Sequence, residues 1–128
     1  MDMNHAELQV SCIAYAIYAE AHTQSIEAQR GVGFLIMNRV KTGRYGDDTC
    51  EVIYAHGQFQ GVSDILKKKH EEPSKKDLLK TELLAIDVYF HRVANPIGSS
   101  LYFHDDSIKS MAHAWGKKQV KIDNLIFY

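Results

Sequence analysis

The chain has 128 residues, of which 45% are hydrophobic and 24% charged, and its formal net charge is -1. This composition is typical of one globular domain that is long enough to bury a hydrophobic core. A near-neutral chain lacks the strong basic field of nucleic-acid-binding proteins, and no apolar run approaches the roughly 20 residues that span a bilayer. We therefore expect a single monomeric domain over residues 1–128, with no nucleic-acid partner and no membrane insertion.

The first ten residues, "MDMNHAELQV", lack the basic start and the long apolar segment of a signal peptide. We therefore expect synthesis in the cytoplasm, so that any action outside the membrane requires another agent to carry or release the chain. Cys12 and Cys50 can form at most one disulfide. The intracellular-looking start favours two free thiols, each packed as a small core residue.

Most of the chain has the pattern of helices. A first helix is expected over about residues 6–21, where Ile13, Ala16, Ile17 and Glu20 share one face at spacings of three and four. Cap-type residues at 23–25 separate it from the next helix. The periodicity thus places a carboxylate, Glu20, on a face that is otherwise apolar.

A second helix is expected over about residues 26–40, with a broad apolar face. Its two internal glycines, Gly31 and Gly33, indicate close packing against another element. A loop and a short helix around "CEVIYA" follow, and then an irregular stretch and a charged connector. A third long helix is expected over about residues 76–93. Its apolar residues in register are Leu79, Leu83, Ile86 and Phe90.

The segment after Gly98 alternates short pieces. "SLYFH" and the two C-terminal runs "QVKI" and "LIFY" have the alternation of short strands, and "SMAHAWG" has the pattern of a helical turn. The expected fold class is therefore α+β, mainly helical, with a small β element made partly by the C-terminus.

Glu20 stands in the run "AIYAEAH" and has two interpretations. In the first, the carboxylate lies near a helix end and simply reaches water. In the second, the helix holds it against an apolar wall. Burial of a carboxyl group disfavours its charged form, which is what a general acid at neutral pH needs. The neighbouring Tyr15, Tyr18 and Ala19 fit the second interpretation.

Two parts of the chain resemble the SleB-type cell-wall hydrolases, the family of spore-cortex lytic enzymes and their phage relatives. The front half, from "AIYAEAH" to "HGQF", is similar to the family's Tyr-x-Glu-Ala element, Asn-Arg-Val helix end and Gln-Phe loop. The matching positions are Tyr18, Glu20, Ala21, Gln29, Asn38, Arg39, Val40, Val52, Ile53, Gln58 and Phe59. In the back half, "GSSLYFH" and "KIDNLIFY" resemble the family's closing segments. The matching positions there are Gly98, Tyr102, Phe103, His104, Ile122, Phe127 and Tyr128.

The resemblance implies a lysozyme-like domain of the goose-type lysozyme and lytic transglycosylase kind, which cleaves the glycan strands of peptidoglycan. It places the family's catalytic acid at Glu20. The chain departs from the family at residues 22–24, where Arg-Gly-Glu is usual. It also departs at Asp123, where Gly is usual, and at Leu125, where His is usual.

The candidate substrate-binding residues are Tyr18, Asn38, Gln58, Phe59, Tyr102, Phe103 and His104. Of these, Gln58, Phe59 and the 102–104 segment are expected to face one groove together with Glu20. Several have a plain structural alternative: Asn38 as a helix cap, and Phe59 and one face of the 102–104 strand as core. Trp115 is either a core residue or a sugar platform. We expect no cofactor and no metal, since the chain lacks His-Glu-x-x-His and Cys-x-x-Cys elements.

Three classes of function follow from these residues. The first is a glycan-strand lytic enzyme, for which we expect the setting of a phage endolysin or virion-associated lysin. It is either a lytic transglycosylase that uses one acid twice or a muramidase with a second carboxylate. Asp47, Asp48, Asp64, Asp105 and Asp106 are the candidates for that carboxylate. The second is an inactive wall-binding or structural protein of the same fold. The third is an amidase with a Cys50–His56 pair.

Overall fold

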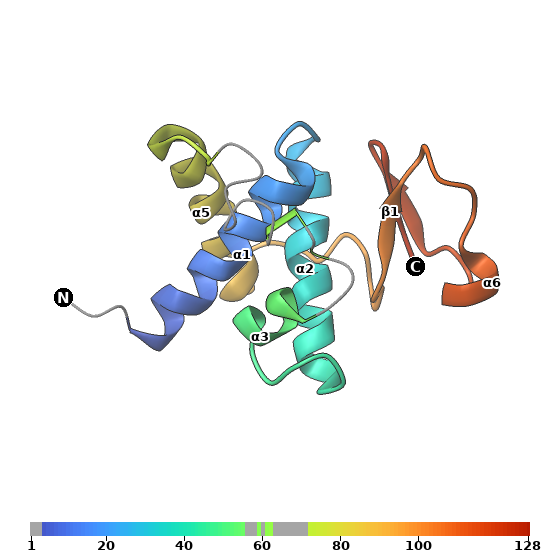
Figure 1. Cartoon of the computed structure of the whole chain (residues 1–128), viewed down its shortest axis with the longest axis horizontal. Helices are drawn as coiled ribbons and strands as arrows, with labels where there is room; N and C mark the ends of the chain where they lie inside the picture. The colour runs from blue at the N-terminus through green and yellow to red at the C-terminus, as the bar shows by residue number, and fades with distance from the viewer. Residues whose placement is uncertain (1–3, 56–58, 60, 63–71) are drawn as a thin grey trace.

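The computed structural model describes residues 4–55, 59, 61–62 and 72–128. In this part of the chain, α1 crosses the centre of a helical body and packs against its three other helices, α2, α3 and α5 (Figure 1). The helices of the body are α1 (His5–Ala21), α2 (Ile26–Thr42), α3 (Thr49–Tyr54) and α5 (Lys75–Tyr89). The expected mainly helical domain is confirmed, and no helix of the described part is long and apolar enough to cross a membrane.

The helices begin where a polar side chain can satisfy a free backbone N–H group. Asn4, Ser25, Asp48 and Ser74 each accept a hydrogen bond from the backbone N–H three residues further on. α2 ends at Gly43, which has a left-handed φ of 71°. The first two helices were predicted to within two residues at each end, because these caps can be recognised in the sequence.

The core lies between α1 and α2 and extends to α5 on one side and to the C-terminal sheet on the other. Ile13, Ala16 and Ile17, the predicted apolar face of α1, are fully buried. A Cβ atom at Gly31 would lie 2.9 Å from Cζ of Phe127, and one at Gly33 would lie 3.1 Å from a methyl group of Val88. The close packing predicted from the two glycines is confirmed.

Helix α5 differs from its prediction in both length and orientation. It ends at Tyr89 rather than near residue 93, because His91 adopts a left-handed φ of 54°. Its buried side chains are small: Thr81, Ala85 and Val88. The larger apolar residues predicted to face the core are instead partly or mostly in water. Exposure is 55% for Leu79, 57% for Leu83 and 51% for Phe90, whereas Ile86 is half-buried.

The C-terminal strands form a small antiparallel sheet in the order β1-β3-β2. Its strands are β1 (Phe103–Asp105), β2 (Val120–Ile122) and β3 (Leu125–Phe127), and the short helix α6 (Ala112–Trp115) lies between β1 and β2 in the chain. Phe127 of β3 pairs with Phe103 of β1 and Val120 of β2. Figure 1 shows the sheet and α6 beyond α2, on the side away from α1 and α5. The predicted strands are confirmed.

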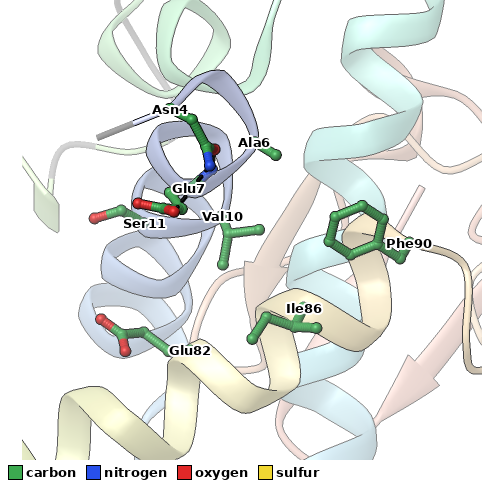
Figure 2. A pocket seen from close by; sticks show the side chains of 8 residues that line it. All are labelled: Asn4, Ala6, Glu7, Val10, Ser11, Glu82, Ile86 and Phe90. Carbon is green, nitrogen blue, oxygen red and sulfur yellow. Dashed lines mark hydrogen bonds between the residues drawn. The ribbon is translucent and has the colours of Figure 1, made fainter. Parts of the chain in front are cut away.

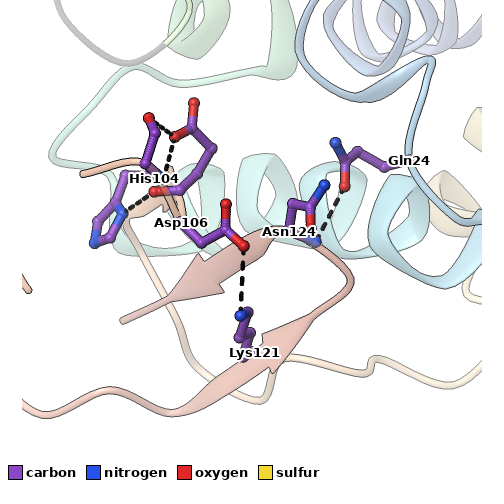
Figure 3. A network of polar contacts seen from close by, with 7 residues as sticks. Gln24, His104, Asp106, Lys121 and Asn124 are labelled. Carbon is purple, nitrogen blue, oxygen red and sulfur yellow. Dashed lines mark hydrogen bonds and ion pairs between the residues drawn. The ribbon is translucent and has the colours of Figure 1, made fainter. Parts of the chain in front are cut away.

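Two polar contacts attach the β2–β3 turn to the start of α2. The Asp123 carboxylate accepts a hydrogen bond from the Ser25 backbone N–H at 2.8 Å. The Gln24 side-chain oxygen accepts one from the Asn124 N–H at 3.2 Å (Figure 3). Asp123, which stands where the family usually has Gly, has a φ of 53°. Its carboxylate gives a structural reason for an acid at this turn.

Cys12 and Cys50 form a disulfide that links α1 to α3, so the predicted free thiols are wrong. Their Cα atoms lie 5.3 Å apart because the two helices pack side by side. This separation lies in the usual range for a disulfide. The prediction rested on the residues around the chain start, which carry no information about a contact between positions 38 residues apart.

Candidate active site

Glu20 lies on the last turn of α1 and continues the buried face of that helix. Its side chain is half-buried, and its Oε1 atom has almost no contact with solvent. Gly61 lies directly against it: a Cβ atom at Gly61 would be 3.1 Å from Oε1 of Glu20 and 3.2 Å from Cβ of Ala19. The carboxylate therefore lies between the end of α1 and the chain around Gly61, where only a residue without a side chain fits easily.

Phe59 and Val62 anchor the chain on either side of Gly61. Both side chains are buried, with 2% of Phe59 exposed. The Phe59 ring lies 6.2 Å from the Phe103 ring, so this chain segment is tied to the C-terminal sheet. The prediction that Phe59 faces the groove is therefore wrong, because its side chain is in the core. Gln58, the neighbouring candidate, lies outside the described residues.

Arg39 connects several of the predicted residues, although the sequence singled it out only through the family resemblance. It is 5% exposed and donates a hydrogen bond from Nε to the Leu101 carbonyl at 2.7 Å. Its guanidinium carbon lies 4.4 Å from the ring centre of Tyr45, 5.3 Å from that of Tyr102 and 5.7 Å from that of Phe59. These distances are typical of cation–π contacts.

Burial lowers the pKa of Arg39 from its ordinary value, while Tyr45 and Tyr102 act in the opposite direction. An arginine remains charged after such a shift, so a fixed positive charge lies between α2 and the start of β1. The sequence signal for this role was a charged residue at the end of an apolar helix face, three residues after Ile36.

Tyr102 is the member of the 102–104 segment that stays half-exposed. Its hydroxyl lies 2.8 Å from that of Tyr45, and its ring stacks on Trp115 with ring centres 5.2 Å apart and planes 8° apart. Burial, followed by the hydrogen bond that the Tyr45 hydroxyl shares with Tyr102, raises the pKa of Tyr45. Of the three predicted residues in this segment, Tyr102 is thus the one with a ring surface near solvent.

Phe103 and His104 are buried, so the prediction that they face the groove is wrong for both side chains. His104 donates from Nδ1 to the Asp105 carbonyl at 2.6 Å, since that carbonyl can only accept. Its Nε2 lies 2.9 Å from the Tyr128 hydroxyl, which also accepts a hydrogen bond from the Met111 backbone N–H at 3.1 Å. His104 therefore holds the C-terminal residue in place.

Asn38 has a structural role that neither sequence interpretation anticipated. Its side-chain nitrogen donates to the backbone carbonyls of Gly98 and Ser100, both at 2.9 Å. This bridge holds the loop before β1 on the end of α2. Both amide hydrogens of Asn38 are used in these two contacts, so its side-chain nitrogen is not available to a sugar.

Tyr18 lies on a different side of α1 from Glu20. Residues two positions apart in an α-helix project about 200° apart around the axis. Tyr18 instead stacks on His22, with ring centres 4.4 Å apart, and its carbonyl accepts a hydrogen bond from Nδ1 of His22 at 2.7 Å. The structure therefore does not bring the Tyr18 ring together with the Glu20 carboxylate.

The candidates for a second carboxylate mostly have local partners. Asp48 caps α3, and Asp106 pairs with Lys121 at 3.5 Å (Figure 3). Asp105 accepts hydrogen bonds from the backbone N–H and the hydroxyl of Ser107, which lower the pKa of its carboxyl group. The Asp47 backbone N–H is bound by the Glu51 carboxylate. Asp64 lies outside the described residues.

The amidase hypothesis is wrong, because the sulfur of Cys50 is bonded to Cys12 and the chain has no third cysteine to act as nucleophile. His56, its proposed base, lies outside the described residues. Within the described ranges, no group of three or more His, Cys, Asp or Glu side chains is arranged to hold a metal ion.

The chain belongs to the cell wall hydrolase family, whose sequence model matches residues 23–128. A curated relative, the spore cortex-lytic enzyme of Oceanobacillus iheyensis, is 26% identical over 117 residues. That alignment covers 91% of this chain and 40% of the relative, so the chain spans about two fifths of the relative's length.

Two solved structures share the fold over almost the whole chain. The catalytic domain of the germination-specific lytic transglycosylase SleB from Bacillus anthracis is 23% identical with a TM-score of 0.72, and 99% of this chain and 98% of that chain are covered. The catalytic domain of the Bacillus cereus SleB protein is 20% identical with a TM-score of 0.71, covering 99% of this chain and 94% of that one. The predicted lysozyme-like fold is therefore confirmed.

Proposed function

We propose that this chain cleaves the glycan strands of peptidoglycan and that Glu20 is its catalytic acid. The observation that carries the proposal is the place of Glu20, on the last turn of α1 with one carboxylate oxygen buried against Gly61. A carboxyl group held at such a position can give a proton to the oxygen of a bound glycosidic bond. Membership of the cell wall hydrolase family supports peptidoglycan as the substrate.

We propose further that Glu20 works alone, as both acid and base. Its carboxyl group protonates the oxygen between N-acetylmuramic acid and N-acetylglucosamine while the bond from that oxygen to C1 breaks. The carboxylate then takes the proton of the C6 hydroxyl as the C6 oxygen bonds to C1. The product is a 1,6-anhydro-muramyl end, no water is consumed, and Glu20 regains its proton.

Two observations favour this route over a muramidase with a second carboxylate. Asp48, Asp105 and Asp106 each have a local structural partner that accounts for their presence. In addition, one solved structure with this fold is the catalytic domain of a lytic transglycosylase. A hydrolase would instead place a second carboxylate across the sugar from Glu20.

Clearing of a suspension of purified peptidoglycan by the chain tests the proposal. The wild type should lower the turbidity, and Glu20→Gln should slow clearing by about 10⁴-fold, the upper range for general acid–base assistance, because one residue serves in both steps. Glu27→Gln is the matched control, since Glu27 is an exposed acid on the first turn of α2. It should clear at the wild-type rate.

Clearing by Glu20→Gln at the wild-type rate would overturn the site. A folded wild type that clears neither cortex nor vegetative peptidoglycan, yet sediments with both, would favour the wall-binding alternative. Circular dichroism of all three proteins separates loss of activity from loss of fold.

We propose that the chain works outside the cytoplasm, after release at phage lysis or as part of a virion. The Cys12–Cys50 disulfide supports an oxidising place of action, where such bonds persist. A thiol assay on the protein isolated from its natural source tests this: two free thiols would contradict it.

A further inference from the structure

Helix α5 and its C-cap residue Phe90 present a largely exposed apolar stripe on the surface of the helical body. Its residues recur at spacings of four, three and four, which is the spacing of the two apolar positions in a coiled-coil heptad. They are Leu79, Leu83, Ile86 and Phe90, and we call them the α5 seam. Three of the four are more than half exposed. A contiguous exposed apolar face of this kind marks an interaction site.

A hollow of about 470 Å³ opens between the seam and α1. Figure 2 shows Val10 of α1 on one side of it, and Ile86 of α5 and the C-cap residue Phe90 on the other. Glu7 and Glu82 add a carboxylate from each helix. Apolar side chains of a second helix laid along the seam would therefore meet apolar surface on both α5 and α1.

The charges beside the seam indicate what that second helix is. In the heptad, Lys80 and Asp87 flank the seam on one side, and Glu82 and Tyr89 flank it on the other. Within the described part of the chain, neither Lys80 nor Asp87 has an ion-pair partner. Opposite charges on one flank of the same helix are complementary to a reversed copy of that helix.

We propose that two copies of this chain associate through their α5 seams as an antiparallel pair. In that arrangement, equivalent flanks face each other, so Lys80 of each copy meets Asp87 of the other, twice by symmetry. Leu79 packs against Phe90 of the second copy, and Leu83 against its Ile86. A parallel pair would instead set Glu82 against Asp87 of the second copy, which is a repulsive contact.

The predicted dimer is weak, because a seam of four residues on a 15-residue helix is smaller than a standard protein interface. A dissociation constant of roughly 10⁻⁵ M is therefore expected. The association is independent of Glu20 and of the proposed reaction.

Sedimentation equilibrium of the intact chain over about 1 µM to 1 mM, which brackets that constant, tests the proposal. The mass of the wild type should rise from 14.6 kDa towards twice that value. Leu83→Glu should raise the dissociation constant at least about 100-fold, because it places two carboxylates in an apolar seam. Ile26→Glu likewise replaces an exposed apolar residue by an acid, but on α2, and should leave the dissociation constant unchanged.

A charge exchange tests the antiparallel arrangement separately. Lys80→Glu and Asp87→Lys should each weaken the dimer roughly tenfold, and the double variant should restore the wild-type constant. A wild type that stays monomeric up to 1 mM, or a Leu83→Glu variant that dimerises as the wild type does, would overturn the proposal. A double variant as weak as either single one would also overturn it.

Discussion

The helical body and the C-terminal region are held together in different ways. In the body, α1, α2 and α5 bury small and branched apolar side chains against one another, and a disulfide fixes α3 to α1. In the C-terminal region, strands of three residues each depend on ring contacts around Trp115 and on the hydrogen bonds of Tyr128. The first kind of packing leaves a helical periodicity in the sequence. The second leaves only short alternating runs, which predict the strands but not the contacts that hold them.

Removal of the disulfide should destabilise the helical body more than any other change considered. The double variant Cys12→Ser with Cys50→Ser should lower the free energy of unfolding by about 4 kcal/mol, because the cross-link closes a loop of 38 residues in the unfolded chain. Urea unfolding of this variant and the wild type measures the difference. Equal stability of the two would mean that helix packing alone holds α3 in place.

Removal of a single hydroxyl group, that of Tyr128, should destabilise the C-terminal region. Tyr128→Phe removes the partner of the buried His104 Nε2 and of the half-buried Met111 N–H. The loss should be about 2 kcal/mol, since polar groups are left without partners. Hydrogen exchange should rise in β1 and α6 and stay unchanged in α1. A uniform rise over the whole chain would show that the two regions unfold as one.

Gly31→Ala tests the contact between the two regions, where Gly31 of α2 lies against Phe127 of β3. The new methyl group would overlap the Phe127 ring, at a cost of about 1–3 kcal/mol, while alanine regains up to about 1 kcal/mol of helix stability. A net loss of about 1 kcal/mol is expected in thermal or urea unfolding. A stabilised variant would show that Phe127 can move away from α2 at little cost.

The smallest effect concerns Asp105 at the end of β1. Its hydrogen bonds with Ser107 lower the pKa of its carboxyl group below the ordinary 3.8, so its stabilisation is present at neutral pH and is lost as the pH falls through that lowered value. The melting temperature of Asp105→Asn should lie slightly below that of the wild type at pH 7, and the two should converge once the pH falls below the lowered pKa of Asp105. A gap that stays constant with pH would rule out the charge as its cause.

The sequence predicted the parts of the fold that depend on local chemistry. The apolar periodicity of residues 6–21, the cap-type residues at 23–25 and the short alternating runs after Gly98 place α1, α2 and the sheet correctly. Gly31 and Gly33 indicated close packing for the right reason, the absence of a side chain.

The face of α5 was predicted wrongly by the same principle. Gly33 brings Val88 so close to α2 that small residues, not leucines, fit the buried side of the helix. The prediction took the largest apolar residues of α5 as its buried face, whereas the small residues are the ones that face the core.

The candidate site was predicted less completely than the fold. Glu20 was recognised because an acid on an apolar helix face is unusual, whereas Gly61, which lies against its carboxylate, had no local signal. Phe59 and His104 were assigned to the groove by residue type and are buried instead. An aromatic or polar side chain can contact substrate or can hold the surrounding loops in place. Residue type alone does not distinguish these two roles.

The measurement that tests the central claim most directly is mass spectrometry of the muropeptides released from peptidoglycan by the wild type. Cleavage by Glu20 alone predicts fragments that end in 1,6-anhydro-muramic acid, each lighter by one water than the corresponding reducing fragment. Their release should be lost in Glu20→Gln and kept in Glu27→Gln. Fragments that carry only reducing ends would contradict the single-acid mechanism, and anhydro fragments released equally by Glu20→Gln would contradict the site itself.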